Sequence, residues 1–221
     1  MASYKRNPAR EVAKAETPTQ IWIDHAFIDE SDLEWLAPVR QLTLWNVTTP
    51  LGFLAKLPHL DWLDLRGGTG VDLERMRGAH KIEYLQVMHV RGMLDLSLAA
   101  ELPNLAYLEL YGLPKVKELP SFKHCTKLER VEMGRLGGLD SFAGILDAPN
   151  LRELLLLNGS KVSPDDLERL KSHPKLEAFS WVDETVSEAR YGPVIKALNK
   201  PSASLQGAPQ WFDERAAKRT D

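Results

Sequence analysis

Short stretches in which apolar and polar residues alternate return at regular intervals along this chain. Each stretch begins with an apolar residue and has two more apolar residues three and five positions later, as in LAYLEL from Leu105. Alternation at period two predicts a β-strand with one buried face. Seven such stretches begin at Val39, Leu60, Ile82, Leu105, Leu128, Leu151 and Leu176. Because the stretches recur about every 23 residues, we predict a solenoid whose neighbouring strands come from neighbouring repeats.

The segments between the strands follow a common pattern of their own. A turn comes first, and a short helical or 3-10 segment with an apolar face follows it. Pro cannot continue a helix and favours extended backbone before it, so Pro two residues ahead of a strand ends the segment. Pro58, Pro103, Pro149 and Pro174 occupy this position. The clearest helix is expected to begin after Ser163, which is a suitable N-cap ahead of Pro164.

The Leu-x-x-Leu-x-Leu spacing over residues 18–186 resembles the leucine-rich-repeat family. The resemblance implies an α/β solenoid of about seven to eight repeats, with a curved parallel sheet on the concave side and short helices or 3-10 turns on the convex side. Many family members carry Asn or Cys eight positions after the motif start. Here that position holds Val47, Gly68, Val90, Leu113, Leu136, Gly159 and Glu184. We therefore expect an irregular bacterial-type array without an Asn ladder.

The two ends of the chain depart from the repeat. We expect residues 1–16 to be disordered and residues 17–186 to form the solenoid, whose degenerate first repeat, PTQIWI from Pro18, caps the array. Residues 187–199 predict a C-terminal capping helix with one apolar face. Residues 200–221 form a tail in which Trp211 and Phe212 favour either packing on the solenoid or a partner-binding segment.

Composition limits the class of protein. The formal net charge of −3 provides no basic field for nucleic acid, and no apolar run is long enough for a membrane helix. The single cysteine, Cys125, cannot form an internal disulfide, and the first twenty residues lack the apolar core of a signal peptide. These features favour a cytoplasmic protein that binds neither nucleic acid nor membrane.

The polar positions within the strands predict the exposed, concave face of the sheet. The second, fourth and sixth residues after each motif start point away from the core and form three columns across the strands. Aromatic residues recur in the second column and carboxylates in the fourth, and Trp, Tyr and Arg are the residue types that dominate interface hot spots. We select as partner-binding candidates Trp45, Trp62, Asp64, Arg66, Tyr84, Met88, Tyr107, Glu109, Tyr111, Arg130 and Glu132. Alternatively, aromatic residues simply suit parallel strands and shield their neighbours.

Motifs for catalysis or cofactor binding are weak. RGGTG, from Arg66 to Gly70, follows a strand but lacks the Lys and Ser/Thr of a phosphate-binding loop, so we interpret it as an ordinary turn. No His or Cys spacing predicts a metal site, and His25 and His89 occupy equivalent turn positions. We expect no cofactor, no metal and no enzymatic activity.

These patterns favour a non-enzymatic protein–protein interaction module. Its aromatic and acidic face suits a protein partner that presents basic groups and apolar anchors. One hypothesis is an intracellular inhibitor or immunity-type protein. The alternative is a structural subunit that self-associates through the same face.

Overall fold

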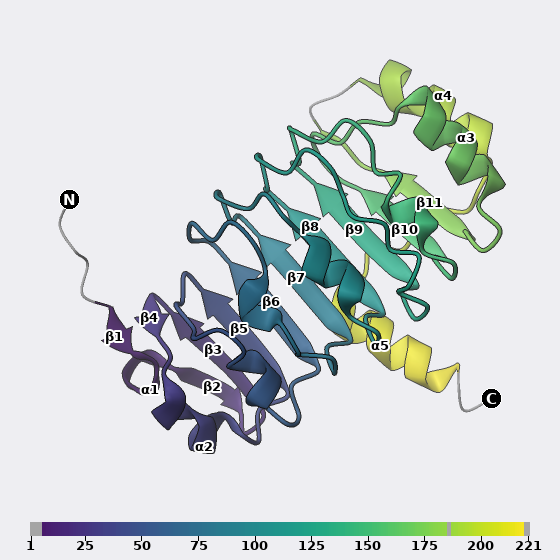
Figure 1. The fold of residues 1–221 in the computed structure, drawn as a ribbon. Helices are drawn as coiled ribbons and strands as arrows, with labels where there is room; N and C mark the ends of the chain where they lie inside the picture. The colour runs from purple at the N-terminus through teal and green to yellow at the C-terminus, as the bar shows by residue number, and fades with distance from the viewer. Residues whose placement is uncertain (1–5, 185–186, 219–221) are drawn as a thin grey trace.

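The computed structural model describes residues 6–184 and 187–218, and a single sheet runs through it from end to end (Figure 1). The spatial order of its nine strands is β11-β10-β9-β8-β7-β6-β5-β3-β2. Every pairing from β3 to β11 is parallel, and β2 is antiparallel to β3. The strands are β2 (Lys14–Thr17), β3 (Gln20–Asp24), β5 (Gln41–Trp45), β6 (Trp62–Arg66), β7 (Tyr84–Met88), β8 (Tyr107–Tyr111), β9 (Arg130–Gly134), β10 (Glu153–Leu156) and β11 (Ala178–Trp181).

The strand register confirms the predicted repeat. Trp62 pairs with Tyr84, Tyr84 with Tyr107, and Tyr107 with Arg130, so each column holds one residue from every repeat. The degenerate repeat is included, because Gln20 pairs with Gln41. One parallel strand per repeat, stacked in sequence order, makes the chain a leucine-rich-repeat solenoid.

The core lies between the sheet and the convex segments. The first, fourth and sixth residues of each motif are buried there, as Leu105, Leu108 and Leu110 show. Convex-side residues such as Phe53, Phe122 and Phe142 close the core from the other side. Each repeat therefore buries its apolar residues only by stacking on its neighbours.

The turn after each strand explains why the array needs no Asn ladder. Six successive repeats place a left-handed residue directly after the strand, at the seventh position from the motif start. These residues are His25, Asn46, Gly67, His89, Gly112 and Arg135, with φ between 48° and 68°. The amide of the turn residue donates to the carbonyl of the next repeat, as His89 does to Tyr111 at 2.8 Å. Backbone hydrogen bonds thus join the turns, and His25 and His89 are turn residues as predicted.

The convex side consists mainly of 3-10 turns. They are η1 (Glu30–Asp32), η2 (Leu54–Lys56), η3 (Glu74–Met76), η4 (Ser97–Glu101) and η5 (Ile145–Asp147), with the short helix α2 (Leu33–Leu36). Only α3 (Pro164–Ser172) is longer, and the Ser163 hydroxyl caps it by accepting the amide of Asp166. The predicted N-cap and first-turn proline are therefore both present.

The structure corrects the expectation of disorder over residues 1–16. Residues 1–5 lie outside the described residues, whereas residues 6–16 form β1 (Asn7–Pro8), α1 (Ala9–Val12) and β2. β1 pairs with β4 (Ala26–Phe27), and Ala9 is buried in the core. β2 occupies the edge of the sheet beside β3 and satisfies backbone groups that an open edge would leave unpaired.

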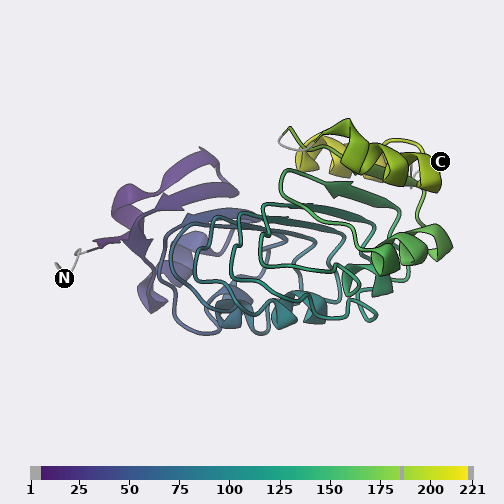
Figure 2. The same cartoon turned by 90° about the horizontal axis from the view of Figure 1, so that it is seen from above.

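The C-terminal segment first caps the array and then turns back. Helix α4 (Glu188–Leu198) packs on β11 and α3, in the segment expected to form a capping helix. The following residues return along β11, where the Phe179 amide donates to the Pro201 carbonyl. Helix α5 (Ala208–Ala217) then lies on the sheet face opposite the 3-10 turns (Figure 2). Of the two alternatives for the tail, the structure has the packed one.

Candidate functional site on the concave face

The concave face carries the three predicted columns, which the strands position at fixed spacing. Side chains alternate across a strand, so the residues two, four and six positions after each motif start share this face. The second column includes Trp62, Tyr84, Tyr107 and Arg130, and the fourth includes Asp64, Gln86, Glu109 and Glu132. The sixth column runs through Trp45, Arg66, Met88, Tyr111 and Gly134.

The aromatic column is covered by the chain's own C-terminal helix. Trp211 packs edge-on against Tyr107, with ring centroids 5.3 Å apart. Phe212 contacts Trp62 at 5.6 Å, and Trp62 lies against Tyr84 at 3.9 Å. Tyr107 is 0% exposed as a result. The tail and the aromatic column together form a second, smaller apolar cluster on the concave side.

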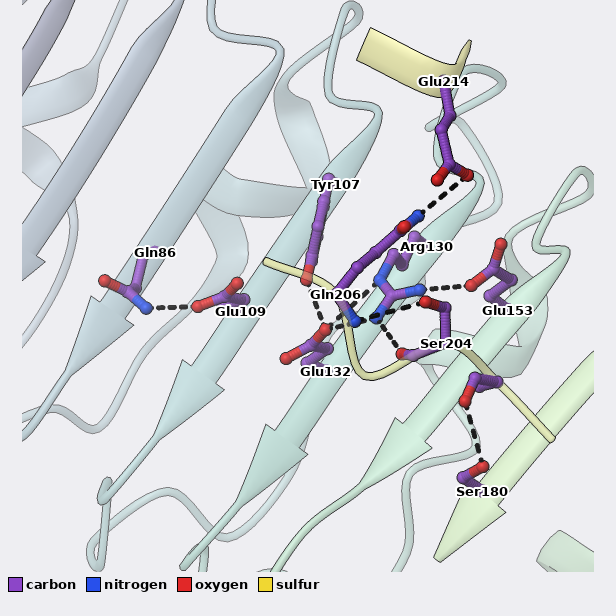
Figure 3. Close-up of polar contacts among 11 residues, drawn as sticks. Gln86, Tyr107, Glu109, Arg130, Glu132, Glu153, Ser180, Ser204, Gln206 and Glu214 are labelled. Carbon is purple, nitrogen blue, oxygen red and sulfur yellow. Dashed lines mark hydrogen bonds and ion pairs between the residues drawn. The ribbon is translucent and has the colours of Figure 1, made fainter. Parts of the chain in front are cut away.

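Polar contacts fix the returning tail to the strands (Figure 3). Arg130 is fully buried and donates to the Ser204 carbonyl at 2.5 Å, while pairing with Glu132 and Glu153. Ser180 donates to the Ala203 carbonyl at 3.4 Å. At the other end of α5, Arg215 pairs with Glu129 at 2.9 Å. Arg130 therefore joins the sheet to the tail through its hydrogen bond to Ser204 and its ion pairs with Glu132 and Glu153.

Because α5 and the tail cover the aromatic column, several of the predicted binding residues are not available to a partner. Tyr84, Tyr107 and Arg130 are buried, and Trp62 is half-buried beneath Phe212, so their rings and guanidinium are not free surface anchors. Strand periodicity predicted correctly which way these side chains point. It carried no information about a segment about a hundred residues away that lies on top of them.

The fourth column forms a continuous polar network across the strands. Arg66 pairs with Asp64 at 2.5 Å and donates to Gln86 at 3.1 Å. Gln86 donates in turn to Glu109, as Figure 3 shows, and the Tyr107 hydroxyl donates to Glu132. Asp64 is buried, and this burial raises the pKa of its carboxyl despite the neighbouring Arg66.

Glu109 is a carboxyl group near the centre of this face whose pKa lies well above its ordinary value. Burial raises the pKa of its carboxyl to about 7, and the charge of Glu132 acts in the same direction. Hydrogen bonds from Tyr107, Tyr84 and Gln86 oppose this rise only partly. A cation placed beside Glu109 and Glu132 would offset both the cost of burying a charged carboxylate and the repulsion between the two carboxylates.

An open hollow of about 350 Å³ lies directly over these two carboxylates. Its walls are apolar, and the exposed lining comes from Met88, Tyr111 and Leu157. Gly134 shapes it, because a Cβ there would meet the Leu157 Cβ at 2.7 Å and the Tyr111 ring at 2.8 Å. We call this site the acidic hollow, defined by Met88, Glu109, Tyr111, Glu132 and Leu157.

Sequence reasoning selected four of these five residues but missed two contributors to the hollow. Leu157 occupies the sixth column, where its apolar side chain was a detectable signal. Gly134 occupies the same column in the preceding repeat, and a glycine between larger residues marks a place where a depression can form.

The remaining candidates lie toward the N-terminal end of the sheet. Trp45 is 38% exposed and contacts Trp22 at a centroid distance of 5.9 Å. The Arg66 guanidinium lies over the Trp22 ring at 4.9 Å. Trp45, Asp64 and Arg66 therefore do not line the acidic hollow, although Gln86 links Arg66 to Glu109.

The described part of the chain contains neither a cluster of metal-binding side chains nor a helix that could span a membrane. Within residues 6–184 and 187–218, no three His, Cys, Asp or Glu side chains come together as a group able to hold a metal ion. No helix described in the structure combines the length and apolar character needed to span a membrane.

Comparison with known proteins gives only distant likenesses. No protein-family model and no curated protein matches the chain. A solved structure of internalin C2 from Listeria monocytogenes is 18% identical, with a TM-score of 0.48, over 72% of this chain and 80% of that one. Internalin F from the same organism is 15% identical, with a TM-score of 0.37, over 84% of this chain and 73% of that one. The fold assignment rests on the strand register described above.

Proposed function

We propose that this protein is a non-enzymatic protein–protein interaction module that receives a partner segment in the acidic hollow. The partner presents a Lys or Arg side chain flanked by apolar residues. The observation that supports this is the pairing of two neighbouring carboxylates, Glu109 and Glu132, with apolar walls above them.

The chemistry of the hollow matches a long basic side chain. Lys and Arg carry an apolar stem below a charged head, so the stem would pack on Met88 and Tyr111 while the head pairs with the carboxylates. The parallel strands hold this surface rigid, which lowers the entropy lost on binding. The covered aromatic column contributes as the support that holds the α5 helix beside the hollow.

The proposal also includes the cellular location of the protein and its biological role. A cytoplasmic location is supported by the single, buried Cys125, whose burial raises the pKa of its thiol to about 11 and keeps it unreactive. An inhibitor or immunity-type role agrees with an acidic hollow that masks basic groups of a partner. Self-association through the aromatic column is disfavoured, because α5 already occupies that column.

A peptide-display selection on the immobilised protein tests the proposal. We expect enrichment of peptides with Lys or Arg next to apolar residues. The double variant Glu109→Gln/Glu132→Gln should lower their affinity at least tenfold, because it removes both charges with little change in shape. Gly134→Leu, which fills the hollow without a change in charge, should do the same.

The matched control is Glu168→Gln/Glu177→Gln, which removes two exposed carboxylates away from the hollow. It should leave peptide affinity within about twofold, since exposed charges are largely screened. Enrichment of acidic or sequence-independent peptides, or equal losses in both double variants, would rule out the hollow as the binding site.

A further inference from the structure

A second pocket, of about 310 Å³, is lined by residues of the N-terminal repeats. The turns that follow β5 and β6 form it, together with Arg6 from the N-terminal segment and Arg75 from η3. The lining is rich in donors, and it includes the Gly67-Gly68-Thr69-Gly70 turn. The pocket shares no residue with the acidic hollow.

Two guanidinium groups reach this pocket without a carboxylate partner among the described residues. Arg75 donates to the Val47 carbonyl at 3.1 Å. Arg6 donates to Asn46 Oδ1 at 2.9 Å and to the Thr48 hydroxyl. Burial lowers the pKa of Arg75, and the charge of Arg6 lowers it further against the opposing effect of Asp72. The pocket thus holds two cations close enough to repel each other.

Further donors in the pocket also lack acceptors. The amides of Gly68, Thr69 and Gly70 have no hydrogen-bond acceptor within residues 6–184 and 187–218. The Thr49 hydroxyl oxygen is buried and has no hydrogen-bond partner in the same part of the chain. Gly67 and Gly68 have φ of 62° and 81°, a left-handed backbone conformation that glycine adopts without steric cost.

Gly70 allows the arginine to approach the turn. A Cβ on Gly70 would lie 2.8 Å from Arg75 Nη2, so the guanidinium would have to move if this residue carried a side chain. The lining also contains two acidic residues. Asp72 accepts the amide of Glu74 and partly offsets the charge of Arg75, whereas Glu74 pairs with Arg77 at 2.6 Å.

We propose that this pocket binds a phosphate group, either free or as a monoester. Arg6 and Arg75 supply charge-assisted hydrogen bonds to its oxygens, and the turn amides and threonine hydroxyls complete the donor set. The RGGTG sequence lacks the marks of a phosphate-binding loop because its cations come from positions about sixty residues before and a few residues after it. The folded chain, and not the local motif, assembles the site.

Isothermal titration with inorganic phosphate at constant ionic strength tests this inference. The unaltered protein should show saturable binding that chloride at the same ionic strength does not reproduce. Arg75→Gln should weaken phosphate binding at least tenfold. The control, Arg77→Gln, removes the same charge from an exposed residue just after the same 3-10 turn and should change affinity by less than about twofold.

Arg6→Gln is the second variant, because Arg6 lies in the N-terminal segment outside the repeats. It too should weaken binding at least tenfold, with the thermal midpoint of the unliganded protein unchanged. O-phosphoserine and adenosine monophosphate then identify the source of the phosphate group, since a probe that binds more tightly than inorganic phosphate indicates a monoester with that attachment. Absence of saturable phosphate binding, or equal effects of Arg75→Gln and Arg77→Gln, would overturn the inference.

Discussion

A single carboxyl group shows how the repeat architecture creates unusual chemistry. Parallel pairing places Glu109 and Glu132 in adjacent strands at the same height, and the tail and Tyr107 shield them from solvent on one side. The resulting pKa of about 7 for Glu109 lies well above its value of 4.5 in an unfolded chain. The folded state therefore binds a proton at Glu109 between these pH values that the unfolded state releases.

This difference predicts how Glu109 affects stability. As pH rises from about 4.5 to 7, the folded state loses the stabilisation that its bound proton gives it, and above pH 7 it holds an unfavourable buried charge. Glu109→Gln should therefore raise the free energy of unfolding at pH 8 by about 1–3 kcal/mol and have little effect near pH 4.5. Urea unfolding at both pH values measures this, with Glu177→Gln as the exposed control. A Glu109→Gln effect that is the same at both pH values would contradict the assignment.

At the scale of elements, α5 differs from the other helices that the structure describes, because it leaves its neighbours in sequence and packs on the middle of the sheet. Trp211 is buried against Tyr107, and Arg215 lies over the Trp211 ring at 5.3 Å while it pairs with Glu129. The contacts of Trp211 with Tyr107 and of Arg215 with Glu129 join residues 86 or more positions apart, whereas the strands contact only adjacent repeats. The helix is therefore held by tertiary packing and not by local propensity.

Removing the central aromatic ring should release α5. We expect Trp211→Ala to increase the rate of proteolytic cleavage between residues 200 and 218 at least tenfold, because truncating a buried Trp costs about 3–5 kcal/mol. Far-UV circular dichroism of the solenoid should stay nearly unchanged. Limited proteolysis with mass spectrometry provides the measurement, and Leu205→Ala, at an exposed site in the same tail, is the control. Equal cleavage rates for both variants would mean that Trp211 does not anchor the helix.

The sequence predicted features that depend on contacts between neighbouring repeats, but not features that depend on contacts between distant segments. The period-two pattern predicted the register of Tyr84, Tyr107 and Arg130, because each strand pairs with the next repeat. It did not predict that Trp211 covers them, since no local pattern links residues about a hundred positions apart. Residues 6–16 were missed for a related reason, as the burial of Ala9 depends on β4 and on the core of the first repeats.

For the whole molecule, stability depends on an unbroken stack of neighbours. Leu108 is fully buried in β8, with β7 on one side and β9 on the other. In a solenoid, the loss of one interface weakens both adjacent repeats, so a defect in the centre affects the entire array. The returning tail strengthens this coupling, because it connects β11 to the middle strands.

Leu108→Ala tests this coupling. The cavity should lower the free energy of unfolding by about 2–5 kcal/mol. We expect circular dichroism and tryptophan fluorescence to report the same urea midpoint, shifted to lower urea. Leu94→Ala, at an exposed position of the neighbouring repeat, should shift the midpoint by less than about 0.5 kcal/mol. Separate midpoints for the two probes would show that the array unfolds in independent parts.

The returning tail also sets an order of events during synthesis. Trp62, Tyr84 and Tyr107 leave the ribosome about 100–150 residues before Trp211 and Phe212, which later cover them. At the usual rate of translation, the aromatic column stays uncovered for about 5–30 s on every nascent chain. During that interval the growing chain exposes a row of aromatic side chains, prone to association with other chains, that the complete protein buries under α5. A chain interrupted before residue 208 would keep this row exposed permanently.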